Sequence, residues 1–358
     1  MVKKEKNKYD YVVLGGGCSG LSLAYHLNIS GKLNNKTLCI VENRDSYQRD
    51  KTWSFWDFGY NPFKDCVIKK WNLFKISNPR SSTIINCKKY PYVSIDSKLF
   101  YEKTINNLKN NPNIYFLKDF QNIELNHGIV FNGIPKILKS NSFYQHFYGL
   151  EIETNNDAFD QNQLHLMDFQ NTKEGVHFFY TLPFTKKKAL IETTWISKNK
   201  LYSKSDYLAE LECYIKNNLK IKNFNISFTE QGLLPLQHES FKTKNNEVLI
   251  GANANLLRKS TGYTFLTIQE HSKFISDNIE HILSLPKFKL KSKYNFYDEI
   301  LFRVIERYPK KMPDIFRSLF TNNTNSVIKF LSSKSNLIND FLAIINLPKR
   351  YFLKALIK

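Results

Sequence analysis

The sequence of 358 residues contains no run of about 18 uncharged apolar residues, the length that a membrane-spanning helix requires. Its five cysteines are scattered without a CxxC pair or a Cys/His cluster, so neither a disulfide framework nor a metal site is indicated. The basic N-terminus is followed by glycines rather than by a continuous apolar segment, so we expect no signal peptide. These absences favour a globular protein of the cytoplasm.

Acidic residues are scarce relative to basic ones. The chain has 32 Asp and Glu residues against 52 Lys and Arg residues, which gives a formal net charge of +20. Such an excess is typical of proteins that bind nucleic acid or an anionic membrane surface. Because the lysines are spread through the whole chain among many Asn, Ile and Tyr residues, we expect no nucleic-acid partner. A general compositional bias and an anionic membrane surface remain as alternatives.

A glycine-rich turn follows the first apolar segment of the chain. It reads Gly15-Gly-Gly17-Cys-Ser-Gly20 and is followed by a helical pattern and a second apolar segment that ends at Glu42. In a βαβ unit of this kind, the first glycine allows the tight turn, the second lets the backbone approach a pyrophosphate, and the third lets helix and strand pack closely. Glu42 is placed to accept from a ribose hydroxyl, which disfavours a 2′-phosphate. The turn alone leaves FAD, NAD and a purely structural role open.

A second segment with the order strand, glycine turn and helix begins at Val248. FAD enzymes often carry such a late segment, whose helix N-terminus stabilises negative charge on the reduced isoalloxazine. Gly251 would form the turn, and Ser260 or Thr261 would cap the helix. Together with the position of the first turn near the start of the chain, this segment favours FAD over NAD. An ordinary capped core helix is the alternative.

Short segments with alternating apolar residues follow one another between residues 121 and 194, which indicates an antiparallel sheet. The predicted fold class is α/β, with a Rossmann-like FAD-binding domain, a second antiparallel-sheet domain for the substrate, and a helical C-terminal region. The predicted ranges are 1–120 and 225–285 for the two parts of the FAD-binding domain, 121–224 for the sheet, and 286–358 for the helical region.

Five short motifs resemble, in the same order, those of the bacterial lycopene beta-cyclase family, and the resemblance covers nearly the whole chain. They are Thr52-Trp53-Ser54-Phe55-Trp56, Gln145-His-Phe-Tyr-Gly-Leu-Glu151, Leu166-Met-Asp-Phe169, Tyr180-Thr-Leu-Pro-Phe184 and Leu190-Ile-Glu-Thr-Thr194. The later turn Ser260-Thr-Gly-Tyr-Thr264 is similar to a turn of the same family. An aromatic core loop is the alternative reading of the first motif.

The resemblance implies an intramolecular lyase that converts the linear psi ends of lycopene to beta rings, giving gamma-carotene or beta-carotene. The cyclisation would be acid-initiated and non-redox, with FAD in its reduced form and NAD(P)H as an indirect reductant. The implied substrate-binding residues are Trp53, Phe55 and Trp56. The implied cofactor-binding residues are Gly15, Gly17, Gly20, Glu42, Gly251, Ser260, Thr261, Gly262 and Tyr263.

The resemblance also implies that Glu192 is the general acid, with a pKa that desolvation raises toward neutrality. A hydrogen-bonding glutamate on a strand is the alternative. Asp168 would either orient the catalytic site or satisfy backbone groups in a turn. Two positions depart from the family: Thr193 stands where an Asp is usual, and Arg258-Lys259 replaces His/Lys-Pro. These departures put the rate and the product specificity in question.

Two other classes of protein share part of this pattern. A flavin-dependent monooxygenase or isoprenoid reductase would need hydride from NAD(P)H, and a non-catalytic flavoprotein would only carry a carotenoid or lipid. The basic, amphipathic region 300–358 fits docking at the inner face of the cell membrane, where a linear carotene would dissolve. A helical cap on the core is the alternative role of that region.

Overall fold

The βαβ unit predicted around the first glycine turn forms the centre of a five-stranded parallel sheet in the computed structural model, which describes residues 6–135, 143–170, 172–198, 202–238 and 241–357. The strand order is β15-β9-β1-β2-β8. The strands β1 and β2 are buried along their whole length, as expected for parallel strands that are covered on both faces. The five strands are β1 (Tyr11–Leu14), β2 (Leu38–Val41), β8 (Ile114–Leu117), β9 (Ile129–Asn132) and β15 (Glu247–Leu249).

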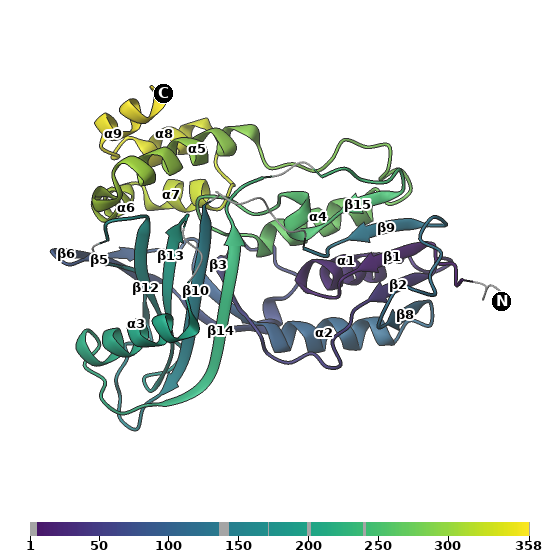
Figure 1. Ribbon diagram of the computed structural model, residues 1–358, viewed down its shortest axis with the longest axis horizontal. Coiled ribbons are helices and arrows are strands. Elements are labelled where there is room, and N and C mark those ends of the chain that lie inside the picture. Colours follow the sequence, from purple (N-terminus) through teal and green to yellow (C-terminus); the bar gives the residue numbers. More distant parts are fainter. Residues whose placement is uncertain (1–5, 136–142, 171, 199–201, 239–240, 358) are drawn as a thin grey trace.

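Three helices pack on this sheet, and α1 contacts both of the others (Figure 1). They are α1 (Cys18–Ile29), α2 (Ser97–Lys109) and α4 (Phe265–Asp277). A small antiparallel sheet with the order β3-β7-β4 adjoins α2 and α4. Its strands are β3 (Thr52–Trp56), β4 (Val67–Trp71) and β7 (Tyr92–Asp96). Short 3-10 turns are η1 (Lys64–Cys66), η2 (Gly251–Ala254) and η3 (Pro309–Lys311).

A seven-stranded sheet forms the second large unit, with the order β14-β10-β13-β12-β11-β5-β6. All neighbouring strands are antiparallel except β11 and β5, which are parallel. The strands are β5 (Leu73–Asn78), β6 (Ser81–Asn86), β10 (Tyr144–Glu153), β11 (Gln163–Gln170), β12 (Val176–Pro183), β13 (Lys188–Ser197) and β14 (Asn225–Pro235).

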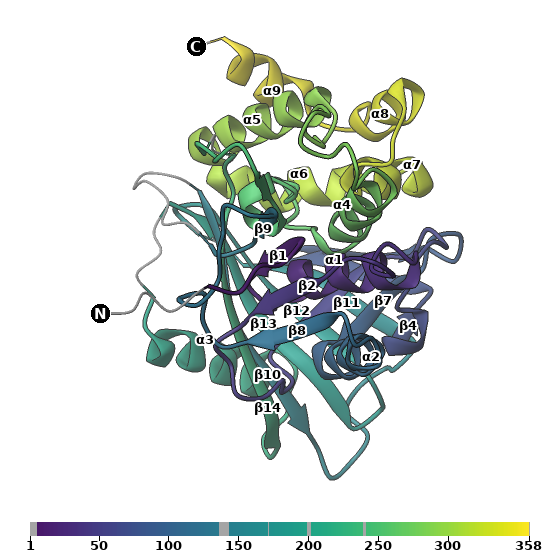
Figure 2. The ribbon, with the colours of Figure 1, turned by 90° about the vertical axis from the view of Figure 1, so that its right-hand side faces the viewer.

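The two faces of this sheet are covered by different helices. On one face, apolar side chains of β10, β12 and β13 pack against α3 (Lys204–Asn217), whose first turn is closed by a capping box between Ser203 and Asp206. The opposite face packs against a layer of C-terminal helices, which Figure 2 shows above the sheets. These helices are α5 (Ser292–Arg307), α6 (Met312–Leu319), α7 (Thr324–Leu331), α8 (Leu337–Ile344) and α9 (Lys349–Leu356).

The fold class predicted from the sequence is confirmed: a Rossmann-like parallel sheet, an antiparallel sheet and C-terminal helices are all present. Strand β9 belongs to the parallel sheet although it follows residue 120, and β5 and β6 belong to the seven-stranded sheet although they precede residue 121. Each of the two sheets is therefore built from strands that lie on both sides of residue 120 in the sequence. Within the described ranges, no helix has the length and apolar character needed to cross a membrane.

Candidate functional site

The first glycine turn leaves the N-terminus of α1 open. Gly15 has a φ of +97°, and a Cβ atom on Gly20 would overlap the carbonyl oxygen of Gly15, so the helix packs tightly on the strand. A Cβ atom on Gly17, the N-cap residue of α1, would meet no heavy atom within 4 Å. Backbone N–H groups at a helix N-terminus favour anions. This turn therefore fits the predicted pyrophosphate site.

Glu42 already has partners next to this turn. Its carboxylate accepts from the Gly16 N–H at 2.9 Å and from the Arg44 guanidinium at 3.1 Å. Burial opposes ionisation, but the hydrogen bonds from Arg44 and Gly16 prevail and lower the pKa of Glu42 below its ordinary value. Glu42 is thus an ionised acceptor at the end of β2, as a ribose contact would require.

The late glycine segment contacts the first one. Gly251 has a φ of +63°, and a Cβ atom there would lie 2.5 Å from Oγ of Ser19, in the first turn of α1. The two segments that the sequence indicated as cofactor-binding, about 230 residues apart, thus meet at one helix N-terminus. Their arrangement fits a dinucleotide cofactor that touches both.

The predicted helix start at Ser260 or Thr261 is wrong, because α4 begins at Phe265 and Thr264 is its N-cap residue. The N–H groups of Thr261 and Gly262 donate to the Arg258 carbonyl oxygen, at 3.2 and 2.8 Å, which closes a turn. Gly262 has a φ of +70°, which a helix does not allow. A Cβ atom on Gly262 would lie 2.5 Å from Oε1 of Gln145, so this turn packs directly on β10.

An apolar cavity lies between this turn, the seven-stranded sheet and the C-terminal helices. Sheet and turn residues on its wall are Gln145, Leu166, Met167, Phe178, Tyr180, Ile196, Ser260, Thr261 and Tyr263. The helical side is lined mainly by aliphatic and aromatic side chains of α5 to α9. Three of the predicted cofactor residues, Ser260, Thr261 and Tyr263, therefore face this cavity.

Glu192 is a neighbour of Tyr180, which lines the cavity. It is directly opposite Tyr180 in the register of β12 and β13, so both side chains point to the same face of the sheet. The Thr194 hydroxyl donates to the Glu192 carboxylate at 2.6 Å. Burial outweighs this hydrogen bond and raises the pKa of Glu192 to about 7. A carboxyl group with this pKa can hold a proton near neutrality and release it, as a general acid must.

Glu230 is a buried carboxyl group on the same face as Glu192, and the sequence did not indicate it. It lies on β14, opposite Gly149 of β10, and Gly149 is in turn opposite Glu192 of β13. Oε2 of Glu230 has no hydrogen-bond partner among the described residues. Burial, followed by repulsion from Glu192, raises the pKa of Glu230 to about 8. In the sequence, Glu230 is one glutamate of a strand, and only the register across β10 relates it to Glu192.

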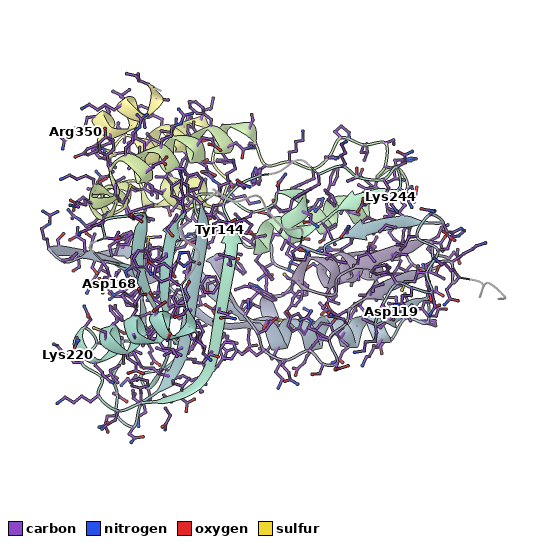
Figure 3. The ribbon with its side chains drawn as sticks, viewed as in Figure 1. Asp119, Tyr144, Asp168, Lys220, Lys244 and Arg350 are labelled. Atoms are coloured by element: carbon purple, nitrogen blue, oxygen red, sulfur yellow. The ribbon has the colours of Figure 1, made fainter. Side chains whose placement is uncertain are left out.

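The structure does not bring Asp168 to this site. Its carboxylate accepts from the Ser77 hydroxyl at 2.5 Å and from the Tyr214 hydroxyl of α3 at 2.7 Å. Asp168 is opposite Phe179 and therefore points to the face that α3 covers (Figure 3). The contacts that the structure gives Asp168 hold α3 on the sheet.

The two departures from the family pattern lie away from the Glu192 carboxyl group. Because side chains alternate along a strand, Thr193 points toward α3, where its hydroxyl donates to Glu210 at 2.6 Å. Arg258 is buried and pairs with Asp298 of α5 at 2.9 Å. Thr193 thus lies on the face that α3 covers. Arg258 connects the turn before α4 to the C-terminal helices through its ion pair with Asp298.

The aromatic side chains of the β3 motif point to two different faces of the strand. Trp53 and Phe55 stack on Phe265 at the start of α4, with ring centroids 5.5 and 5.0 Å apart. Trp56 points the other way and contacts Tyr92, whose hydroxyl lies 3.5 Å from that of Tyr263. The described lining of the cavity contains none of the three predicted substrate residues. Trp56 and Tyr92 belong to the core cluster beneath the C-terminal helices, and Trp53 and Phe55 pack in the core around α4.

Several known proteins share this architecture. A geranylgeranyl bacteriochlorophyll reductase-like protein from Thermoplasma acidophilum superposes with a TM-score of 0.64 at 14% identity, over 97% of this chain and 98% of that one. A flavoprotein/dehydrogenase from Cytophaga hutchinsonii gives 0.63 at 12% identity, over 98% and 99%. A flavin-dependent brominase gives 0.60 at 10% identity, over 91% and 94%. At these identities the likeness shows the fold, which is that of flavin enzymes.

Comparison with known sequences identifies the family of this chain. Chloroplastic neoxanthin synthase of Solanum tuberosum is 23% identical over 298 residues, 72% of this chain and 57% of that protein. Capsanthin/capsorubin synthase of Capsicum annuum is 22% identical over 298 residues, 72% of this chain and 58% of that protein. The chain thus spans somewhat more than half the length of these relatives. The model of the lycopene cyclase protein family matches residues 10–349, and the chain therefore belongs to that family.

Proposed function

We propose that the chain is a lycopene beta-cyclase that binds reduced FAD and closes the linear ends of lycopene to beta rings. The observation that carries this proposal is Glu192, a partly buried carboxyl group with a raised pKa, next to Tyr180 in the wall of an apolar cavity. Ring closure requires a proton at C2 of the terminal alkene, bond formation from C1 to C6 through a tertiary cation, and loss of a proton from C6. One proton enters and one leaves, so no net reduction occurs.

The residues of the chain have distinct parts in this reaction. Glu192 donates the first proton. The apolar wall excludes water, which would otherwise capture the cation as an alcohol. Tyr180 and Tyr263 contribute aromatic rings to the cavity wall, and such rings stabilise a positive charge. The glycine turn at the N-terminus of α1 would hold FAD, whose reduced form would supply negative charge that favours the cation.

The FAD site is tested by replacing Gly17 with Ala. Because Gly17 has a φ of −80° and open space beside it, Gly17→Ala is expected to fold with a parent-like melting temperature. The methyl group would stand where the pyrophosphate approaches, so we expect FAD binding to weaken about tenfold or more. The measurement is flavin titration of the apoprotein, with circular dichroism as the folding check.

Gly20→Ala is the contrasting variant, because its Cβ would overlap the Gly15 carbonyl oxygen inside the turn. It is expected to lose soluble protein rather than flavin alone. Parent-like FAD affinity in Gly17→Ala would contradict the proposed pyrophosphate position.

We place a membrane-docking surface on α8 and α9, at the mouth of the cavity. Large apolar side chains are exposed there, including Ile338 at 68% and Phe341 at 63%. Exposed cations accompany them on α9, and Figure 3 shows Arg350 at the outer side of the helical layer. Leu353 and Leu356 are exposed and also line the cavity. A lipid-soluble substrate would therefore enter from the bilayer without crossing water.

The double variant Ile338→Glu/Phe341→Glu tests this surface. Both side chains are exposed, so little change in stability is expected. We expect binding to vesicles of phosphatidylglycerol and phosphatidylcholine to weaken about tenfold or more in a sedimentation assay, and the remaining binding to fall with salt. Ile84→Glu, an exposed residue of β6, is the matched control and should bind vesicles like the parent. Equal binding by all three proteins would contradict the surface.

The proposed activity is tested by expressing the chain in a bacterial host that accumulates lycopene. Gamma-carotene or beta-carotene is expected in the pigment extract. Unchanged lycopene, despite soluble protein loaded with flavin, would contradict the proposal. If the purified protein instead oxidises NAD(P)H in step with saturation or hydroxylation of an isoprenoid, the reductase or monooxygenase alternative would replace it.

A further inference from the structure

One row of side chains crosses four strands of the seven-stranded sheet. Tyr180 of β12, Glu192 of β13, Gly149 of β10 and Glu230 of β14 are paired in register, each opposite the next. Residues paired in this way point to one face. The row therefore runs from the cavity, which Tyr180 lines, to Glu192 and then past Gly149 to Glu230.

Gly149 leaves the space between the two glutamates open. A Cβ atom at this position would lie 3.1 Å from Cγ of Glu230 and 3.8 Å from Cβ of Glu192. Any larger residue would fill the gap and push the Glu230 side chain away. The glycine thus leaves room for two carboxyl side chains, two strands apart, on the same face of the strand between them.

The surroundings do not neutralise two negative charges. Arg49 is already paired with Asp96 at 3.2 Å and Glu151 at 2.7 Å. The positive charge of Lys51 lowers the pKa of both glutamates. However, Lys51 forms no ion pair with either of them within 4.0 Å. Oε2 of Glu230 lies buried without a hydrogen-bond partner in the described chain. Two ionised carboxylates in such a site repel each other strongly, and a shared proton removes that repulsion.

We propose that Glu230 and Glu192 hold a single proton between them, and that Glu230 thereby keeps Glu192 protonated as the acid for ring closure. This inference rests on the proposed cyclase function. Glu230 is a positioning residue, because it acts through Glu192 and not on the substrate. In one reaction cycle, Glu192 gives its proton to C2, and the pair recovers one proton when C6 loses its own. The pair therefore ends each cycle with the charge it had at the start.

The pH dependence of ring closure tests the role of Glu230. Because repulsion between two carboxylates is mutual, removing the charge of residue 230 in Glu230→Gln should let Glu192 lose its proton at lower pH. We expect the upper limb of the pH profile to move down by about one unit or more, with activity lost at neutral pH and recovered in acid. Glu192→Gln should be inactive across the whole range. The assay uses the flavin-loaded protein, reduced FAD and lycopene in phosphatidylcholine vesicles.

Other groups near the pair set the baseline of this profile and stay unchanged in both variants. They are Arg49, Lys51, Thr52, Tyr92, Glu151, Tyr180, Thr194 and Tyr263. A uniform loss of activity without any shift of the profile would assign Glu230 a merely structural role and overturn the inference.

Infrared spectroscopy tests the pair without requiring catalysis. The carbonyl stretch of a protonated carboxyl group is followed against pH in ¹³C-Glu-labelled protein. One buried carboxyl group should lose its proton near neutrality in the parent, and the corresponding midpoint should fall in Glu192→Gln, where only Glu230 remains. An unchanged midpoint in that variant would show that the two groups do not share a proton. If the midpoint falls but the parent never cyclises lycopene, the pair stands and the proposed function fails.

Discussion

Replacing Glu192 with Gln is expected to reduce beta-ring formation by about 10²- to 10⁴-fold, the usual contribution of a positioned general acid. The amide has nearly the same size as the carboxyl group and can still accept from the Thr194 hydroxyl, but it cannot give a proton to C2 of the alkene. In the lycopene-accumulating host, the variant should leave lycopene as the main pigment. The purified variant should retain FAD and the parent melting temperature.

Glu210→Gln is the matched control for this experiment. Glu210 is a partly buried glutamate of α3, and burial raises its pKa as well, but it lies on the opposite face of the sheet, where it accepts from Thr193 and Trp195. Its replacement should leave ring formation within about threefold of the parent, because no group on the cavity side changes. Equal loss of cyclic carotene in both variants would mean that any buried glutamate supports the fold, and the acid assignment to Glu192 would then be withdrawn.

The sequence was sufficient for the parts of the site that depend on local patterns. The glycine turn Gly15 to Gly20 and the apolar segments on either side determine a βαβ unit by spacing alone. The order of short motifs predicted the family, which the match over residues 10–349 confirms, and Glu192 as the acid stays a prediction of that resemblance. The start of α4 was misplaced because Ser260 and Thr261 resemble cap residues, whereas the positive φ of Gly262 makes this segment a separate turn.

The sequence alone could not predict the parts of the site that depend on strand register. Glu192 and Glu230 are neighbours only because β10 pairs with both β13 and β14, with Gly149 opposite each of them. The register of β11 shifts between His165 and Asp168. Such a bulge interrupts the alternation of side chains between the two faces of a strand, so the sequence does not show that Asp168 lies on the α3 face. By contrast, the opposite directions of Glu192 and Thr193 follow from alternation alone, so the change at residue 193 bears on α3 and not on the acid.

Asp298→Asn is expected to destabilise the protein by about 3–5 kcal/mol, the usual cost of leaving one member of a buried ion pair without its partner. Arg258 and Asp298 are each only 2% exposed, and the Arg258 guanidinium also donates to the Phe330 carbonyl oxygen at 3.1 Å. Its charge would stay buried between the turn that precedes α4 and the C-terminal helices. We expect a lower midpoint of urea unfolding and a loosened cavity, because Asp298 is itself part of the cavity wall.

An exposed ion pair on α5 supplies the control. Lys198 binds Glu306 at 2.5 Å, and the two side chains are 41% and 55% exposed, so water can solvate Lys198 when the pair is broken. Glu306→Gln should cost at most about 1 kcal/mol, as exposed ion pairs usually do. Adding Arg258→Met to Asp298→Asn should recover part of the loss, because the uncompensated charge is then gone. Equal destabilisation by Asp298→Asn and Glu306→Gln would show that burial of the Arg258 charge does not decide how this turn is held on α5.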